Sequence, residues 1–269
     1  MTDEHAIRPP RIVLLDADMA EPLSADLGTG RVAAMSVRSP VAEGPNEDAA
    51  VAVDAGEVVL FGVADGYGGG PTGERASQLA VGALSAAAGL AGDGAVRLVA
   101  AGRAANRAVL QLGTGAATTL AAVAVEGDRV STASVGDSMI VVVGQRGKLK
   151  LRTVPHSPVG YAVESGMLDE ADAMHHEARH FVSNMVGEPT LRMELTLGTV
   201  LSPRDTVIAA SDGLWDNLHL DEVLDVVRTG ALEDAAAELA RRTRARMIEP
   251  REGEPSKCDD CTFILFRPS

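Results

Sequence analysis

Aromatic side chains are scarce in this chain of 269 residues, where phenylalanine, tryptophan and tyrosine together make up only 3%. Hydrophobic residues nevertheless reach 46%, so the core has to be built mainly from alanine, valine, leucine and isoleucine. That much apolar sequence excludes a largely disordered chain. It is enough to bury a substantial core in one large domain or two small ones.

Long apolar runs, basic tracts and a disulfide framework are also missing. No uninterrupted apolar stretch approaches the length of about 18 residues that a transmembrane helix needs, and the opening MTDEHAIRPP lacks the pattern of a secretion signal. Two cysteines are too few for a disulfide framework, so we expect a cytoplasmic protein. The net charge of -14 disfavours nucleic acid and membrane surfaces as partners.

The order of the apolar segments predicts an α+β fold. Strands are expected at residues 31–37, 49–54 and 58–65, in several runs between 116 and 153, at 206–210 and at 261–267. Apolar residues recur at helical spacing in residues 73–90 and 94–112, and again between 220 and 247. We assign residues 1–30 to an N-terminal extension, in which residues 11–15 could form a strand, and residues 31–269 to one domain.

Carboxylates stand beside the expected strands at five places: Glu47 and Asp48 in NEDA, Asp65 in VADG, Asp137 in SVGDS, Asp212 in ASDG, and Asp259 and Asp260 in CDDCT. Strand ends in a packed domain are rigid and position such groups accurately. Mg²⁺ and Mn²⁺ prefer oxygen ligands, and their charge relieves the repulsion within a carboxylate cluster. A single Asp-Gly pair is usually only a turn. Their recurrence predicts a site for divalent metals, with Asp65 at its centre.

As an ordered set, these segments resemble the metal-dependent protein phosphatases of the PPM or type 2C family. The matching stretches are NEDA (46–49), VADGYGG (63–69), GERAS (73–77), GAATTL (115–120), SVGDS (134–138), ASDGLWD (210–216) and DDCTFIL (259–265). The resemblance as a whole covers roughly residues 31–267. The resemblance implies a four-layer α-β-β-α sandwich, in which two antiparallel sheets are flanked by helices. It also implies a metal site of the bacterial type at one end of the sheets.

The resemblance assigns a set of metal ligands: Glu47, Asp48, Asp65, Gly66, Asp137, Asp212 and Asp259. Asp65 would bridge two ions, and Asp212 and Asp259 match ligands of the second. Glu47 would reach the ions mostly through water, and Asp137 would help to hold a third, weaker ion. The implied cofactors are therefore two or three Mn²⁺ or Mg²⁺ ions.

The reaction that the resemblance implies is hydrolysis of phosphoserine or phosphothreonine on a protein. A metal-bridging water attacks phosphorus, with Asp65 and Asp212 acting through this activated water. The substrate would be a phosphoprotein, with a Ser/Thr kinase as a further partner. We expect a monomer.

The substrate side of the site departs from the family pattern. Most members carry an arginine three residues before the Asn of NED, where it grips phosphate bidentately, and this chain has Glu43 there. Arg38 could substitute, and Tyr67, where many members have histidine, could donate a hydrogen bond. The alternative is a phosphatase-like, metal-binding regulatory module with weak or no turnover. A hydrolase of small phosphoesters is a third possibility.

Two further patterns favour structural roles over chemistry. Cys258 and Cys261 enclose Asp259, but no second such pair accompanies them, so a structural role is favoured over a redox or zinc site. His176 and His180 would share a helix face, where a solvated polar surface is favoured over a metal pair. A substrate-facing role is the second choice for this histidine segment.

Overall fold

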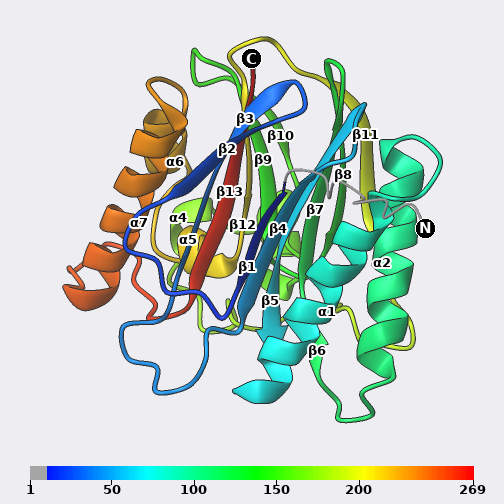
Figure 1. Cartoon of the computed structure of the whole chain (residues 1–269). Coiled ribbons are helices and arrows are strands. Elements are labelled where there is room, and N and C mark those ends of the chain that lie inside the picture. The colour runs from blue at the N-terminus through cyan, green and yellow to red at the C-terminus, as the bar shows by residue number, and fades with distance from the viewer. Residues whose placement is uncertain (1–10) are drawn as a thin grey trace.

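The computed structural model describes residues 11–269, which form two antiparallel β-sheets packed face to face (Figure 1). The first sheet has the order β1 (Arg11–Leu15), β4 (Asp48–Asp54), β5 (Val58–Tyr67), β7 (Leu120–Glu126), β8 (Arg129–Val135) and β11 (Glu194–Val200), and the short β6 (Ala117–Thr118) pairs with the end of β5. The second has the order β10 (Leu149–Arg152), β9 (Met139–Val143), β12 (Thr206–Ala210), β13 (Cys261–Pro268), β3 (Gly30–Val37) and β2 (Leu23–Leu27).

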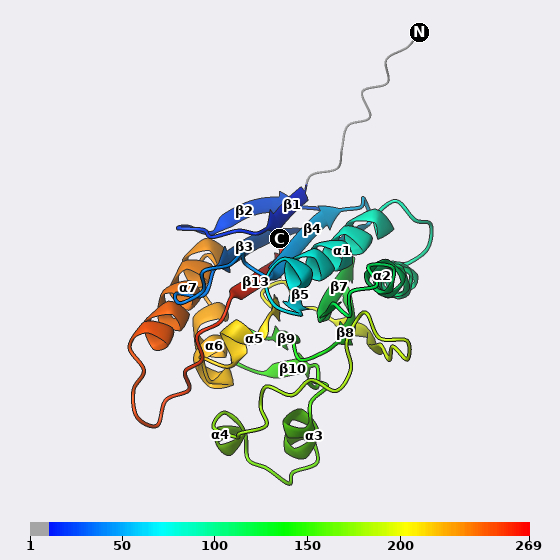
Figure 2. The same cartoon turned by 90° about the horizontal axis from the view of Figure 1, so that it is seen from below.

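Helices cover the outer face of each sheet, so the chain forms four layers (Figure 2). The first sheet packs against α1 (Pro71–Ala87) and α2 (Gly94–Leu110), and the second against α6 (Leu220–Val227) and α7 (Leu232–Ile248). Three short helices, α3 (Pro158–Glu164), α4 (Glu170–Ala173) and α5 (Asp212–Trp215), lie in the connecting segments. The predicted α-β-β-α sandwich is confirmed.

Alternation along the strands divides the core into apolar layers. In β4, Ala50 and Ala52 face the second sheet, whereas Val51 faces the helices on the first. Between the sheets, Phe61 of β5 and Phe266 of β13 stack with their ring centroids 5.7 Å apart. Elsewhere the layers are filled mainly by aliphatic side chains, with Phe263 and Trp215 in the layer between the second sheet and its helices.

Two strands from the expected N-terminal extension, β1 and β2, join the two sheets. Strand β1 pairs along its whole length with β4, from Arg11 opposite Val53 to Leu15 opposite Ala49, and β2 pairs with β3. Ile12 is buried between the sheets, and this burial is what holds β1 in place. The sandwich therefore includes these residues, and residues 1–10 of the expected extension lie outside the described part.

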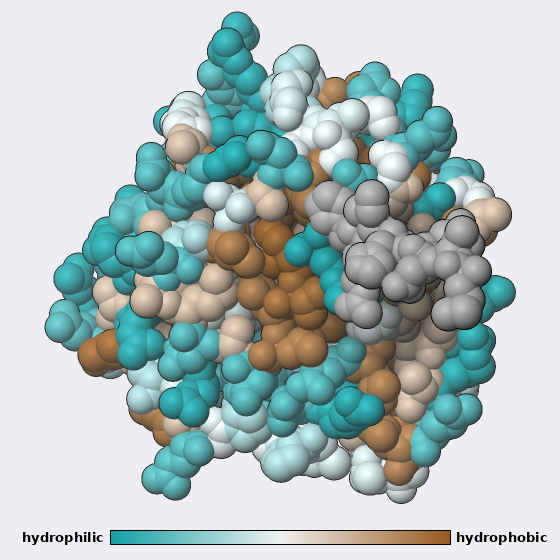
Figure 3. Space-filling model, viewed as in Figure 1, coloured by the Kyte–Doolittle hydropathy of each residue, from teal (hydrophilic) through white to brown (hydrophobic). Residues whose placement is uncertain are grey.

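Apolar side chains are exposed where the edge strands of the two sheets meet the surface. Figure 3 shows an apolar area over this face, and Val13, Leu15 and Leu23 are 42%, 43% and 46% exposed. Such an edge can pair with another chain, so the expectation of a monomer stays a prediction. None of the helices within residues 11–269 combines the length and the apolar character needed to cross a bilayer.

Candidate metal centre

Neighbouring strands β4 and β5 bring Asp48 and Asp65 together. The two residues are direct partners in the antiparallel register, so their side chains leave the sheet on the same side. Two hydrogen bonds with Thr119 fix the backbone of Asp65. The Asp65 N–H donates to Thr119 Oγ1 at 2.9 Å, and the Asp65 carbonyl accepts from Thr119 N at 2.8 Å. The end of β5 is therefore a rigid support for the Asp65 carboxylate.

Asp48 connects this strand pair to the second sheet. The residue is only 2% exposed, and its Oδ2 accepts a hydrogen bond from Ser211 Oγ at 2.7 Å. Ser211 precedes Asp212 at the point where β12 ends and α5 begins. Asp48 therefore ties the segment that carries Asp212 to the strand opposite Asp65.

Glu47, in the loop before β4, is held by hydrogen bonds to both its backbone N–H and its side-chain carboxylate. The Asp260 carboxylate accepts from Glu47 N at 2.7 Å and from Ser39 N at 2.8 Å, which fixes this loop to the start of β13. The Glu47 carboxylate accepts from Gly70 N at 2.5 Å, at the beginning of α1. The side chain is thereby directed toward the glycine-rich segment after β5.

Gly66 and Tyr67 continue β5 beyond Asp65 and pair with the short strand β6. A Cβ on Gly66 would lie 2.2 Å from the carbonyl oxygen of Gly73, so glycine at this position lets α1 approach the end of the strand. Tyr67 is 64% exposed and stands on the cleft wall. Its hydroxyl remains a predicted substrate contact.

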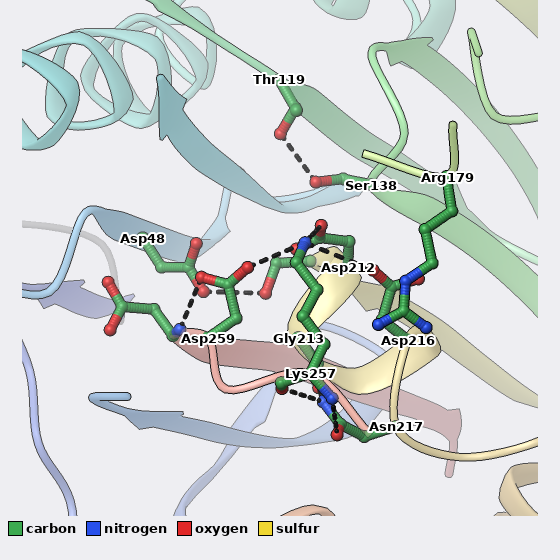
Figure 4. A network of polar contacts seen from close by, with 12 residues as sticks. Asp48, Thr119, Ser138, Arg179, Asp212, Gly213, Asp216, Asn217, Lys257 and Asp259 are labelled. Atoms are coloured by element: carbon green, nitrogen blue, oxygen red, sulfur yellow. Dashed lines mark hydrogen bonds and ion pairs between the residues drawn. The ribbon is translucent and has the colours of Figure 1, made fainter. Parts of the chain in front are cut away.

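Asp137 approaches the site from the turn between β8 and β9. Gly136 before it has φ of 91°, a conformation that favours glycine, and a Cβ there would lie 2.6 Å from Thr119 Cγ2. Ser138 after it shares a hydrogen bond of 2.6 Å with the Thr119 hydroxyl (Figure 4). Thr119 thus supports both the strand of Asp65 and the turn of Asp137.

Three carboxylates surround the ammonium group of Lys257 (Figure 4). Its Nζ lies 2.9 Å from Asp259 Oδ2 and 3.2 Å from Asp216 Oδ2, and it also pairs with Asp212 Oδ2. The second oxygen of Asp212, Oδ1, is buried and has no hydrogen-bond partner among the described residues. Lys257 and Asp216 were not among the predicted site residues. The sequence could have predicted Asp216 as a site residue, because it follows Asp212 by one helical turn.

Burial raises the pKa values of the carboxyls gathered here. Burial, followed by the charge of Asp212, raises the pKa of Asp137 to about 8 and the pKa values of Asp216 and Asp259 to about 6. For Asp65, burial and then the charge of neighbouring carboxylates raise the pKa well above the ordinary value. The cluster is therefore short of positive charge, and a bound cation would stabilise its ionised form.

The donors at this site suit a hard divalent cation. Within residues 11–269, no three His, Cys, Asp or Glu side chains already converge closely enough to enclose an ion. The carboxylates nevertheless hold a cation, the Lys257 ammonium, and Asp212 Oδ1 is an acceptor without a partner. Carboxylate and carbonyl oxygens are the ligands that Mg²⁺ and Mn²⁺ prefer. Asp65, Gly66, Asp212 and Asp259 therefore fit a metal ion, provided that Lys257 moves aside.

An open cleft of about 1120 Å³ lies over these carboxylates. Its wall includes the glycine-rich segment after β5, parts of the 39–45 loop and residues 180–182. Arg38 is not on this wall, and its guanidinium donates to the Gly44 carbonyl at 3.2 Å. Glu43 is exposed beside lining residues Ala42 and Gly44. Among the described residues that line the cleft, Lys257 is the only lysine or arginine.

The histidine segment does not form the expected helix. Helix α4 ends at Ala173, and His176 and His180 follow outside any helix, so they do not share a helix face. His180 lines the cleft, whereas His176 Nδ1 accepts from Ala178 N at 3.0 Å. Cys258 and Cys261 are both free, the first exposed and the second buried in β13.

The chain matches the model of the protein phosphatase 2C family over residues 41–247. It belongs to this family. The serine/threonine protein phosphatase PstP of Mycobacterium tuberculosis is 31% identical to it over 193 residues, which cover 67% of this chain and 36% of that protein. A 2C-type protein of Streptococcus pyogenes is 33% identical over 114 residues, which cover 42% of this chain and 46% of the relative. The chain thus spans less than half of the length of these relatives.

Solved structures of serine/threonine phosphatases superpose on most of this chain. The serine/threonine phosphatase of S. agalactiae superposes with a TM-score of 0.75 at 27% identity, covering 88% of this chain and 99% of that one. The catalytic domain of PstP in complex with two manganese ions gives a TM-score of 0.72 at 26% identity, covering 88% of this chain and 97% of that one. Membership of the family that the sequence resembles and the predicted fold are both confirmed.

Proposed function

We propose that this chain is a metal-dependent protein phosphatase that hydrolyses phosphoserine and phosphothreonine. The observation that carries the proposal is the convergence of Asp65, Asp137, Asp212 and Asp259, from four separate strand ends, on one open cleft. Carboxylates gathered in this way repel one another unless cations lie between them. A cleft that is open above such a centre can admit a side chain of another protein.

The residues of the site have separate tasks in this function. Two or three Mn²⁺ or Mg²⁺ ions bound there would neutralise the phosphoryl oxygens and supply an acidic water as the nucleophile. Asp65, held by Thr119, and Asp212, held through Ser211 and Asp48, fix the ligand oxygens at the cleft floor. Preorganised ligands of this kind keep attacking and leaving groups aligned.

The substrate that suits this cleft is a phosphorylated segment of a protein, and the kinase that makes it is a further predicted partner. Arg38 and Tyr67 remain the proposed contacts to the phosphorylated segment, with Tyr67 already on the cleft wall. Both cysteines are free, which agrees with the reducing cytoplasm as the proposed location.

The test is Mn²⁺-dependent hydrolysis of p-nitrophenyl phosphate and of phosphoserine and phosphothreonine peptides. We expect wild type to turn over the peptides and Asp65→Asn to lose this activity. Asp128→Asn is the matched control, because Asp128 is exposed in the β7–β8 turn, away from the cleft. A protein that binds Mn²⁺ yet leaves every one of these substrates untouched would overturn the proposal.

A regulatory module with weak or no turnover is the second candidate, and two observations favour it. Glu43 stands at the expected place of the phosphate-gripping arginine, and Lys257 is paired with Asp212 and Asp259. Such a module would bind Mn²⁺ and a protein partner without releasing phosphate. The same peptide assay separates it from the phosphatase.

A further inference from the structure

Lys257 is the only lysine or arginine among the described residues that line the acidic cleft. Its ammonium pairs with Asp212, Asp216 and Asp259 (Figure 4). The side chain of Lys257 is 24% exposed, and those of Asp212 and Asp216 are 14% and 18% exposed. The attraction within pairs that are partly shielded from water is less screened than at the surface, and removing one partner leaves an uncompensated charge.

The backbone of Lys257 is also held in place. Asn217, which is 0% exposed, donates from Nδ2 to the Lys257 carbonyl at 2.9 Å and accepts from Lys257 N at 2.9 Å. The same Asn217 amide donates to the Gly213 carbonyl at 2.9 Å, which joins Lys257 to the segment of Asp212. Arg179 donates to the carbonyl of the preceding residue, Ser256, at 3.1 Å. These contacts fix the place from which the lysine side chain extends.

The oxygens that hold Lys257 are those expected to bind metal. Its ammonium pairs with carboxylate oxygens of Asp212 and Asp259, so its positive charge lies where a divalent ion would be bound. When a charged ammonium and a divalent ion share the same carboxylates, they repel each other strongly. Asp212 and Asp259 therefore cannot serve both at once.

We propose that Lys257 is an internal cation that occupies part of the metal site and must be displaced before Asp212 and Asp259 can hold a second divalent ion. The inference rests on the proposed metal-dependent function. A site that is available for only a fraction of the time binds with an affinity reduced by that fraction, so Lys257 weakens metal binding. It also stabilises the metal-free protein, because the carboxylates would otherwise repel one another.

Calorimetric titration of the metal-free protein with MnCl₂ tests this competition by comparing wild type with Lys257→Met. We expect the weaker of the two Kd values for Mn²⁺ to fall at least about tenfold in the variant, since its ligands are free. In EDTA the variant should unfold at a lower temperature than wild type, and excess Mn²⁺ should close or reverse this gap. A lysine with a purely structural role would lower the Tm in both conditions and leave the Kd unchanged.

Two further variants complete the experiment. Lys257→Gln keeps a hydrogen-bond donor beside the carboxylates, so it folds more readily without metal, and its Kd should shift in the same direction. Lys148→Met removes the same charge from the exposed β9–β10 turn and should leave the Kd unchanged. Equal Kd values for wild type and both Lys257 variants would overturn this inference and leave the proposed function standing. If neither wild type nor any of the variants binds Mn²⁺, both the inference about Lys257 and the proposed metal-dependent function are overturned.

Discussion

The carboxylate of Glu47 lies directly against the backbone of Gly73, where an added Cβ would sit 1.8 Å from Glu47 Oε2. This contact places the first turn of α1 beside the metal centre. Gly73→Ala should therefore push the Glu47 side chain out of position. We expect the apparent affinity for Mn²⁺, measured by titration, to fall about tenfold or more, as it does when residues that support a metal ligand are changed.

Gly82→Ala is the matched control for Gly73→Ala. Both glycines lie in α1, but a Cβ on Gly82 meets no atom within 4 Å. Alanine should stabilise this exposed stretch of helix by up to about 1 kcal/mol and leave Mn²⁺ binding unchanged. Wild-type affinity in Gly73→Ala would show that Glu47 does not depend on this contact.

Asp260 is expected to contribute to stability rather than to bind metal itself. Its two carboxylate oxygens accept from Ser39 N and Glu47 N, and the residue is 8% exposed. Asp260→Ala leaves both N–H groups without an acceptor, which should lower the free energy of unfolding in urea by about 2–3 kcal/mol. Asp260→Asn keeps one carbonyl oxygen, so its loss should be about half as large. Equal stability of the two variants would contradict this account.

The sequence was most informative where a continuous apolar run is followed by an aspartate. Strands β5 and β12 are buried along most of their length, and each leads directly to the predicted Asp65 or Asp212. Strands β2 and β11 were not predicted. Both lie at sheet edges and are largely half-buried or exposed, so LSADL and ELTLGTV lack the continuous apolar run that marks the buried strands.

Contacts between distant parts of the chain could not be predicted from local pattern. Lys257 pairs with Asp212 across 45 residues of sequence, and Asp48 receives its hydrogen bond from Ser211 across 163. Nothing in SKCDDC distinguishes Lys257 from a solvated lysine. Its place follows only from the packing of β13 beside β12 and from the Asn217 amide.

Glu43→Arg should improve substrate capture. Position 43 lies between Ala42 and Gly44, which line the cleft, and the cleft carries an excess of carboxylates over its single lysine. A cation added there attracts the phosphate dianion before the chemical step. We expect KM for a phosphopeptide to fall about threefold to tenfold with little change in kcat, and the effect to shrink at high salt.

Glu57→Arg is the control for Glu43→Arg, because it makes the same change of charge in the exposed β4–β5 turn. This turn lies at the end of β5 opposite to Asp65. The KM of the Glu57→Arg variant should match that of wild type. An equal decrease in both variants would mean that net charge, rather than a local contact at position 43, governs substrate binding.

Asp137 and Asp259 should make the metal-free protein less stable as the pH rises. Their pKa values of about 8 and about 6 stand above the ordinary value of about 3.9, so the folded state keeps protons that the unfolded chain has released. This stabilising contribution is fully present below about pH 4 and is lost as the pH rises through about 8. In EDTA, the free energy of unfolding in urea should fall by at least about 1 kcal/mol between pH 5 and pH 8.

Excess Mn²⁺ should reverse the direction of this pH dependence. Metal ligands must be deprotonated, so the stabilisation by Mn²⁺ grows as the carboxyls ionise, and binding releases protons. Asp137→Asn removes the carboxyl with the higher of the two pKa values and should flatten the metal-free profile above pH 6. If metal-free wild type instead gains stability from pH 5 to pH 8, the carboxylates are not held protonated by burial, and Lys257 alone must balance their charge.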